Sequence, residues 1–382
     1  MRMLSIAILC AFAGIGCAGL RLTQPLKSAS DDWTMQGGAP DRHHTAVTVP
    51  QLPLVRLWEY NAQGGILATP LVRDSIVIVA TLHGELQAID LRNGRRLGYE
   101  KLGAPITGTP ALNGTIVYVP LSSANGSLVA FDLRENRIVW QAIAGPIESG
   151  VLLERTNVYV ATLNGSVLSF DARTGEERWK ASLGPQKDRK PIRSTPAYVA
   201  GVVVVGSDDG TLNGLNAADG TERWKVRMSA SIFAGPVIAG EVAVVGDVRG
   251  EVVAVEIASG TVRWRHEAGG PIYGQSSSDG VSVYVPTAAG RILAIDAATG
   301  AERWSYEGSS VFNSAPLIAG DRLYIPSLDC TVAILDTKSG ELIDRLTFDG
   351  RVKVSPVIWR GYVLVVSEDK FLSAFVHKGE TP

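Results

Sequence analysis

The sequence shows no excess of charge of either sign. Its 36 Lys and Arg residues are balanced by 38 Asp and Glu residues, the formal net charge is -2, and no run of basic residues occurs. A protein that binds the phosphates of nucleic acid needs a basic surface patch. We therefore expect no nucleic-acid partner.

Common catalytic motifs and membrane-length apolar runs are also missing. The chain has no His-x-x-x-His metal pair, no Gly-x-Ser-x-Gly elbow and no Gly-Lys-Thr phosphate loop. The apolar run from Leu4 to Ala13 is shorter than the roughly 20 residues that a membrane-spanning helix needs. The sequence therefore predicts none of the enzymes that these motifs mark, and no membrane-spanning helix.

The chain does contain an eightfold repeat with a period of roughly 40 residues. Each unit has a β-rich run, a turn that ends in Gly, an alternating strand that ends in an acid or amide, and a second Gly turn followed by Trp. The acids and amides are Asp90, Asp132, Asp171, Asn216, Glu256, Asp296 and Asp336. In the last two units, Cys330 and Lys370 replace the first Gly.

The Trp series shows how the repeat closes. Its members are Trp140, Trp179, Trp224, Trp264 and Trp304, with Gly98 and Asp344 in this place in the first and seventh units. The eighth unit stops at about Val376, before its fourth strand, whereas Arg56–Tyr60 carries Trp58 and has no unit of its own. A first strand that completes the last sheet closes a ring. We predict an all-β protein, an eight-bladed β-propeller of four-stranded blades over 56–377, with the Trp rings packed between blades.

The first 16 residues resemble a bacterial lipoprotein signal peptide. The apolar run ends in Gly14-Ile15-Gly16, followed by Cys17, as in the lipobox, although that motif prefers Leu at the place of Gly14. The resemblance implies that Cys17 carries lipid and that, with Ala18 next, the protein sits at the outer membrane and faces the periplasm. The alternative is an ordinary secretory signal with a chance Cys.

Cysteine usage fits this interpretation. Cys10 would be removed with the signal peptide and Cys17 would carry lipid, so Cys330 would be the single remaining thiol and no disulfide could form within the mature chain. No His lies close to Cys330 in the sequence, so we do not expect a catalytic thiol.

Two segments precede the propeller. Residues 17–31 are interpreted as a polar tether. Residues 32–55 form a lead-in segment that is expected to pack on the propeller, and residues 378–382 form a short tail. The adjacent His43 and His44 have no third His nearby, and we interpret them as part of a solvated loop rather than as metal ligands.

The repeat unit Asp-Gly-x-Leu-x-Ala-x-Asp-x-x-Thr-Gly-x-x-x-Trp resembles the pyrroloquinoline-quinone-like propeller repeat, and Trp33 to Arg42 looks like the Trp-x-x-x-Gly-Gly-x-x-x-Arg segment found ahead of many such propellers. Two families with this repeat are relevant. The outer-membrane assembly lipoprotein BamB resembles the chain in length, lipobox, blade number and lack of inserted domains. The quinoprotein dehydrogenases are longer and usually carry a vicinal Cys pair, which is absent here.

One position of the repeat varies without restriction. When the units are aligned by the Pro that begins most inner strands, the residue three places earlier differs in every unit: Leu67, Thr107, Glu148, Arg193, Phe233, Tyr273, Asn313 and Lys353. The flanking positions stay small or apolar. We interpret this rim ring as facing one end of the central channel, where binding residues on a rigid scaffold concentrate.

The first functional hypothesis is a protein-docking patch on this rim, made by Lys190, Ile192, Arg193, Phe233 and Tyr273. BamB-like proteins use a Leu-x-Leu-Arg turn at about this place to hold the assembly protein. Here Ile192 and Arg193 keep the end of that turn, Lys190 replaces the first Leu, and the family's paired Asp on the next loop is missing. The resemblance implies a non-enzymatic scaffold without a cofactor, which is bound to the membrane by lipid only and whose partner is the outer-membrane β-barrel assembly machinery.

The second hypothesis is a quinoprotein or another propeller that binds a small ligand in the channel. Arg193 and Lys353 would then contact the carboxylates of pyrroloquinoline quinone, and Glu148 and Asn313 would bind calcium. Calcium takes six or more oxygen ligands, of which only two stand out. A dehydrogenase would also need a carboxylate base beside the quinone.

Overall fold

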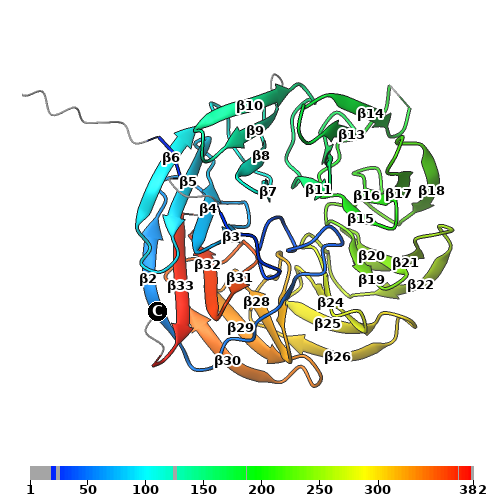
Figure 1. The fold of residues 1–382 in the computed structure, drawn as a ribbon. Helices are drawn as coiled ribbons and strands as arrows, with labels where there is room; N and C mark the ends of the chain where they lie inside the picture. Colours follow the sequence, from blue (N-terminus) through cyan, green and yellow to red (C-terminus); the bar gives the residue numbers. More distant parts are fainter. Residues whose placement is uncertain (1–18, 23–25, 124–126, 186, 369, 380–382) are drawn as a thin grey trace, which may run out of the picture.

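The protein is a disc of eight β-sheets arranged around a central axis (Figure 1). This computed structural model describes the whole chain except residues 1–18, 23–25, 124–126, 186, 369 and 380–382. Each sheet contains an antiparallel four-stranded blade, and the blades are numbered 1 to 8 in chain order; the sheet of blade 7 has a fifth strand from the N-terminal part of the chain. The predicted eight-bladed β-propeller is therefore confirmed. In the described part of the chain, no helix is long and apolar enough to cross a membrane.

The strands of each blade run from the channel outwards. The innermost strands are β3 (Leu71–Arg73), β7 (Ala111–Asn113), β11 (Leu152–Glu154), β15 (Ala197–Val199), β19 (Val237–Ala239), β23 (Ser277–Ser278), β27 (Leu317–Ala319) and β31 (Val357–Trp359). The second strands are β4 (Ile76–Ala80), β8 (Ile116–Pro120), β12 (Asn157–Ala161), β16 (Val202–Gly206), β20 (Val242–Gly246), β24 (Ser282–Pro286), β28 (Arg322–Pro326) and β32 (Tyr362–Ser367).

The third strands are β5 (Glu85–Asp90), β9 (Leu128–Asp132), β13 (Ser166–Asp171), β17 (Thr211–Asn216), β21 (Glu251–Glu256), β25 (Arg291–Asp296), β29 (Thr331–Asp336) and β33 (Phe371–His377). The outer strands are β6 (Arg96–Lys101), β10 (Arg137–Ala142), β14 (Glu177–Ser182), β18 (Glu222–Arg227), β22 (Val262–Glu267), β26 (Glu302–Glu307), β30 (Leu342–Thr347) and, in blade 8, β2 (Leu54–Asn61). β2 pairs antiparallel with β33, with Leu54 opposite His377, so the blade contains both ends of the propeller.

The acids that end the third strands organise the outer turns. The carboxylate of Asp171 accepts hydrogen bonds from the backbone N–H groups of Arg173 and Thr174, at 2.9 Å each. The hydrogen bond from Arg178, together with these turn bonds, lowers the pKa of Asp171 to about 2. Gly175 then takes a φ of 76°, a conformation that a side chain would strain. The acid and the Gly together fix the hairpin, as the repeat predicts.

The Trp side chains close the joints between blades. In six joints the indole Nε1–H of one blade donates to a backbone carbonyl in the next blade, at 2.7 to 3.0 Å. These pairs are Trp58–Leu91, Trp140–Ala172, Trp179–Ala217, Trp224–Ile257, Trp264–Ala297 and Trp304–Thr337. The rings also lie against the turn glycines of the next blade, where a Cβ would collide with them. Packing between blades is thus what these Trp residues do.

The joint between blades 1 and 2 has no Trp, and the N-terminal segment fills it. Gly98 stands in the Trp position, and a Cβ on it would lie 2.9 Å from the carbonyl oxygen of Gly19. Leu20 is fully buried there, and the N–H of Leu22 donates to the Leu133 carbonyl at 2.8 Å. That carbonyl corresponds in the repeat to the ones that the indoles reach in other joints. Part of the tether predicted over residues 17–31 therefore packs on the propeller. It is not polar throughout, because it contains the buried residues Leu20 and Leu22.

The lead-in segment crosses one mouth of the channel (Figure 1). It forms backbone hydrogen bonds with the second residue of six inner strands: Val72, Leu112, Tyr198, Ile238, Ser278 and Ile318. Within this segment, β1 (Thr45–Ala46) pairs parallel with β27. These bonds satisfy inner strand edges that would otherwise face the channel unpaired.

Arg42 extends the same contacts to blade 3, whose inner strand the lead-in backbone does not reach. The guanidinium is completely buried and donates to the carbonyl oxygens of Val151, Pro196 and Gln36. Burial lowers its pKa, while the charge of Asp41 opposes that change. The buried guanidinium of Arg42 is compensated by these carbonyl oxygens, so Arg42 links the lead-in segment to blades 3 and 4.

Candidate functional site

All eight residues of the rim ring line a single cavity of about 230 Å³ at the open mouth of the channel. Each precedes its blade's inner strand, so the start of every blade contributes one side chain. The residue just before each of them is buried and apolar: Ile66, Ile106, Ile147, Ile192, Ile232, Ile272, Phe312 and Val352. This alternation holds the loops rigidly and turns the variable side chains towards the axis.

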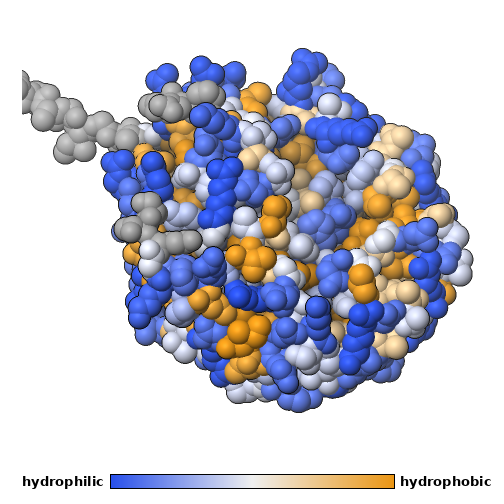
Figure 2. Space-filling model, turned by 60° about the horizontal axis from the view of Figure 1, so that its bottom comes forward, coloured by the Kyte–Doolittle hydropathy of each residue, from blue (hydrophilic) through white to orange (hydrophobic). Residues whose placement is uncertain are grey.

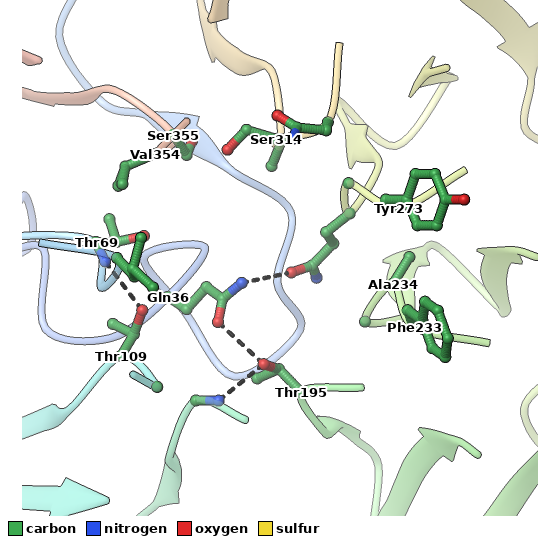
Figure 3. Close-up of a pocket in the computed structure, with 18 of the residues that line it drawn as sticks. Gln36, Thr69, Thr109, Thr195, Phe233, Ala234, Tyr273, Ser314, Val354 and Ser355 are labelled. Atoms are coloured by element: carbon green, nitrogen blue, oxygen red, sulfur yellow. Dashed lines mark hydrogen bonds between the residues drawn. The ribbon is translucent and has the colours of Figure 1, made fainter. Parts of the chain in front are cut away.

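The lead-in segment forms the floor of the cavity. Gln36 donates to the side-chain oxygen of Gln275 at 3.3 Å and accepts from the Thr195 hydroxyl at 3.0 Å. The Thr195 oxygen in turn accepts the N–H of Gly150 at 2.9 Å. Figure 3 shows Gln36 reaching across the channel to these blades. The channel is therefore a polar funnel that is closed at its base.

His44 belongs to this floor, which corrects the prediction of a solvated loop. Its side chain is fully buried and lines the cavity near Gln275. Burial is the main cause that lowers its pKa to about 3, and the positive charges of Arg42 and His43 act in the same direction. His44 is neutral at physiological pH. His43 is only partly buried and lies 3.7 Å from Asp41.

Arg193 lies at the centre of a connected strip on the rim. Its guanidinium pairs with Asp208 and lies 3.6 Å from Glu148. The guanidinium carbon is 5.6 Å from the centre of the Phe233 ring, and that ring stacks on Tyr273 with centres 6.2 Å apart. Blades 3 to 6 thus present an acid, an arginine and two aromatic rings in sequence.

The strip is open to solvent. The side chain of Arg193 is 42% exposed, and Tyr273 is 46% exposed. Figure 3 shows Phe233 and Tyr273 side by side at the edge of the cavity. Because Asp208 and Glu148 hold the guanidinium, its orientation is fixed before any partner arrives, so little side-chain entropy is lost on binding.

Two residues predicted for the docking patch lie apart from the strip. Ile192 is completely buried among core residues such as Trp179, so it supports the rim from inside and cannot contact a partner. The sequence does indicate that Ile192 is buried, because the equivalent residue in every other unit is apolar. Lys190 is exposed on the preceding loop but does not line the cavity. Asp208 pairs with Arg193, and nothing in the repeat pattern indicates this contact.

The four residues considered for a quinone and calcium, Glu148, Arg193, Asn313 and Lys353, do line the same cavity. Glu148 is the only carboxylate among the lining residues, and it already faces Arg193. Among the described residues, no group of three or more His, Cys, Asp or Glu could hold a metal ion. Calcium requires six to eight oxygen ligands, so this set of donors does not fit it.

The proposed lipidation site and the thiol of the propeller are separate questions. Cys17, the predicted lipidation site, lies outside the described residues. Cys330 takes a φ of 67° in the turn between β28 and β29, the conformation that Gly adopts at equivalent turns such as Gly290, where φ is 85°. It is a free thiol that occupies a glycine position.

Comparisons with known proteins agree with this fold. A family model described as outer membrane protein assembly factor BamB matches residues 55–143, 163–315 and 271–343. The crystal structure of BamB from Moraxella catarrhalis is 18% identical with a TM-score of 0.70, over 85% of this chain and 99% of that one. No curated protein matches the sequence.

Enzymes share the fold as well. The quinohemoprotein alcohol dehydrogenase from Comamonas testosteroni is 15% identical with a TM-score of 0.75, over 93% of this chain and 82% of that one. A europium-containing methanol dehydrogenase is 12% identical with a TM-score of 0.78, over 92% of this chain and 99% of that one. At such identities the solved structures show a common fold, and function has to be argued from the site.

Proposed function

Because the chain belongs to the family of the outer membrane protein assembly factor BamB, we propose that it is a non-enzymatic, periplasm-facing lipoprotein that holds a protein partner during assembly of outer-membrane β-barrels. The strip of Arg193, Phe233 and Tyr273 carries this proposal. Arginine and aromatic side chains supply most of the binding energy at protein interfaces. The strip is exposed, connected and mounted on a rigid ring.

The chemistry of the strip defines the partner surface that suits it. Glu148 and Asp208 leave Arg193 with little unbalanced charge, so the strip does not act as a simple cation. The stacked rings of Phe233 and Tyr273 offer a flat apolar face with a hydroxyl at one edge. A partner loop with an apolar side chain beside a hydrogen-bond acceptor would complement both parts.

A pull-down from solubilised membranes tests this role. The wild-type chain should recover the β-barrel assembly protein, and the double change Arg193→Glu with Tyr273→Ala should reduce recovery at least tenfold, because it removes two anchors of about 1 kcal/mol or more each. Tyr99→Ala, which removes a partly exposed aromatic residue on an outer strand, is the matched control. Recovery of no assembly protein by the wild type would refute the specific role.

The absence of enzymatic activity is a separate part of the proposal. The misfit of the cavity to calcium supports it, since Glu148 is the only carboxylate in the lining. The purified protein, incubated with pyrroloquinoline quinone, Ca²⁺ and a primary alcohol, should not reduce an electron-accepting dye above the rate without protein. Dye reduction that depends on both the alcohol and the protein would overturn this part.

The membrane attachment is tested at Cys17. If this residue carries lipid, the wild-type protein should be found in the membrane fraction and should incorporate labelled fatty acid. The Cys17→Ala variant should do neither. A wild-type protein that stays in the soluble fraction would refute lipidation without affecting the pull-down test.

A further inference from the structure

A second surface lies on the opposite face of the disc from the rim, beside the N-terminal segment. It is a groove of about 540 Å³ along the turns of blade 1. Four cationic side chains, Arg21, Lys27, Arg92 and Arg95, line it together with two acids. The apolar part of its lining includes Leu26 and Leu97. We call this surface the blade 1 groove.

The charge of the groove is not cancelled by its acids. Asp90 is bound by Arg92 at 2.8 Å, and the carboxylate of Asp74 accepts the backbone N–H of Lys27 at 3.0 Å. Neither Arg21 nor Arg95 takes part in any ion pair found among the described residues. Both side chains are exposed. The four cations of the groove face two acids, which leaves an excess of two positive charges for an external anion.

The position of these charges is fixed by the fold. The indole of Trp58 donates to Leu91 at 2.7 Å and lies against Gly94, which holds the turn that carries Arg92 and Arg95. The burial of Leu20 and Leu22 in the joint between blades 1 and 2 holds Arg21 between them. The fold thus fixes the backbone positions that carry Arg21, Arg92 and Arg95 on one side of the groove.

Blade 1 differs from the other blades in this respect. Its outer turn has three arginines, Arg92, Arg95 and Arg96, against one acid. The equivalent turn of blade 6 has one cation, Arg303, with Asp296 and Glu302. This turn of blade 1 therefore has a local excess of positive charge in a chain whose net charge is -2.

We propose that the blade 1 groove binds the phosphate-bearing headgroups of an anionic phospholipid surface, and that it seats the propeller on the membrane by this face. Basic side chains next to a membrane attachment point are attracted to anionic lipids, and leucines beside them can contact the apolar part of the interface. The described chain begins two residues after Cys17, so a lipid on Cys17 would place the groove at the bilayer. This part rests on the proposed function.

The geometry also assigns the orientation of the docking strip. In blade 1, the rim residue Leu67 precedes the inner strand β3, whereas Asp74, at the groove, follows that strand. The rim and the groove therefore lie at opposite ends of the inner strands. A propeller seated by the groove presents Arg193, Phe233 and Tyr273 away from the bilayer, towards the periplasm.

Vesicle co-sedimentation of the unacylated chain from residue 18 onward tests the groove independently of Cys17 and of any protein partner. This chain contains every described residue. It should bind vesicles of phosphatidylcholine with one third phosphatidylglycerol, and should bind pure phosphatidylcholine at least tenfold more weakly. Raising the salt from 50 to 300 mM should weaken the binding, since the attraction is between exposed charges.

The double variant Arg21→Glu with Arg95→Glu should lower the partition coefficient on the anionic vesicles about 30-fold or more, because each basic residue near such a surface changes it about fivefold. Lys180→Glu with Lys225→Glu, which makes the same charge change on blades 3 and 4, is the matched control and should retain most of the binding. Equal losses in the two variants, or equal binding to the two kinds of vesicle, would overturn the proposal.

Orientation can be measured in the same system. A dye on Asn93→Cys, in the turn between Asp90 and Arg95, should be quenched by lipids with a quencher in their headgroup, in a background with Cys330→Ser. A dye on the native Cys330, which lies in a turn on the rim face, should not be quenched. The reverse pattern would contradict this seating, whereas a failure of the pull-down would leave the vesicle result unaffected.

Discussion

The backbone N–H of Leu22 donates to the carbonyl oxygen of Leu133 at 2.8 Å, which is the bond that a Trp indole makes at the equivalent carbonyl in six other joints. The N-terminal segment has thus taken over the role of a missing side chain. Gly98 leaves the space for it. The segment is part of the fold, and its loss would open a joint between blades.

Restoring the Trp in blade 1 should expel the segment. In Gly98→Trp the new side chain would occupy the place of Leu20, whose Cα lies 3.1 Å from the Cβ position. We expect trypsin to cleave after Arg21 at least tenfold faster than in the wild type, while the propeller remains folded. Leu342→Trp, which adds the same side chain at an exposed site on β30, should leave cleavage unchanged. A wild-type cleavage rate in Gly98→Trp would show that the segment does not depend on this space.

Each Trp joint should contribute to stability through both its hydrogen bond and its ring. Trp264→Phe removes the 2.9 Å bond to Ala297 and part of the ring that covers Gly300. We expect the free energy of unfolding to fall by about 1–3 kcal/mol. Ile143→Ala, at a residue that is 72% exposed, should change it by less than about 0.5 kcal/mol. Urea denaturation measures both, and equal losses would contradict the role assigned to the joint.

The φ of Cys330 is 67°. This left-handed conformation has a higher free energy for Cys than for Gly. Cys330→Gly should raise the free energy of unfolding by about 1 kcal/mol, because the left-handed conformation has no steric penalty in Gly. Cys330→Ala keeps the penalty and should give no comparable gain. The urea midpoints of the two variants compare their stabilities. If Cys330→Gly is no more stable than Cys330→Ala, the backbone at Cys330 is not strained.

His44 should make the protein sensitive to acid. Its pKa is lowered to about 3 in the folded state by burial, whereas an unfolded His titrates near 6.5. As the pH falls below about 6.5, the unfolded state takes up the proton first, so stability is lost from there down to about pH 3. Between pH 7 and pH 5 we expect a loss of about 2 kcal/mol from this residue.

Unfolding by urea at the two pH values measures this loss. The His44→Asn variant should lack it, even if its stability is lower at both pH values. His83→Asn, which changes an exposed histidine, should keep the wild-type dependence. A His44→Asn variant with the full wild-type pH dependence would show that other groups cause it.

The repeat made most of the fold predictable because it is a local signal. The acid of Asp171 and the Gly at 175 fix a hairpin within a few residues, and the same pattern recurs along the chain. The rim ring followed from the same alignment, since Glu148, Arg193 and Phe233 vary where their neighbours do not. All eight of its residues do line one cavity.

The lead-in segment was less predictable because its bonds are long-range and mostly made by the backbone. Nothing near His44 in the sequence indicates that Ile318 will bond to its carbonyl or that Gln275 will lie beside it. The burial of Leu20 likewise depends on Gly98, far along the chain. An apolar residue stands before every rim position, and this pattern indicates that Ile192 is buried, whereas the likeness of Ile192 and Arg193 to a docking turn favours an exposed side chain.

The pairing of β2 with β33 also bears on how the protein is made. The ribosome makes the chain from its N-terminus, so β2 has no partner until nearly the whole chain has been synthesised. During that interval the growing stack of sheets exposes open edges that invite association with other chains. The ring closes only when β33 has been made. A chaperone that covers exposed sheet edges would therefore protect this protein most just before that strand is complete.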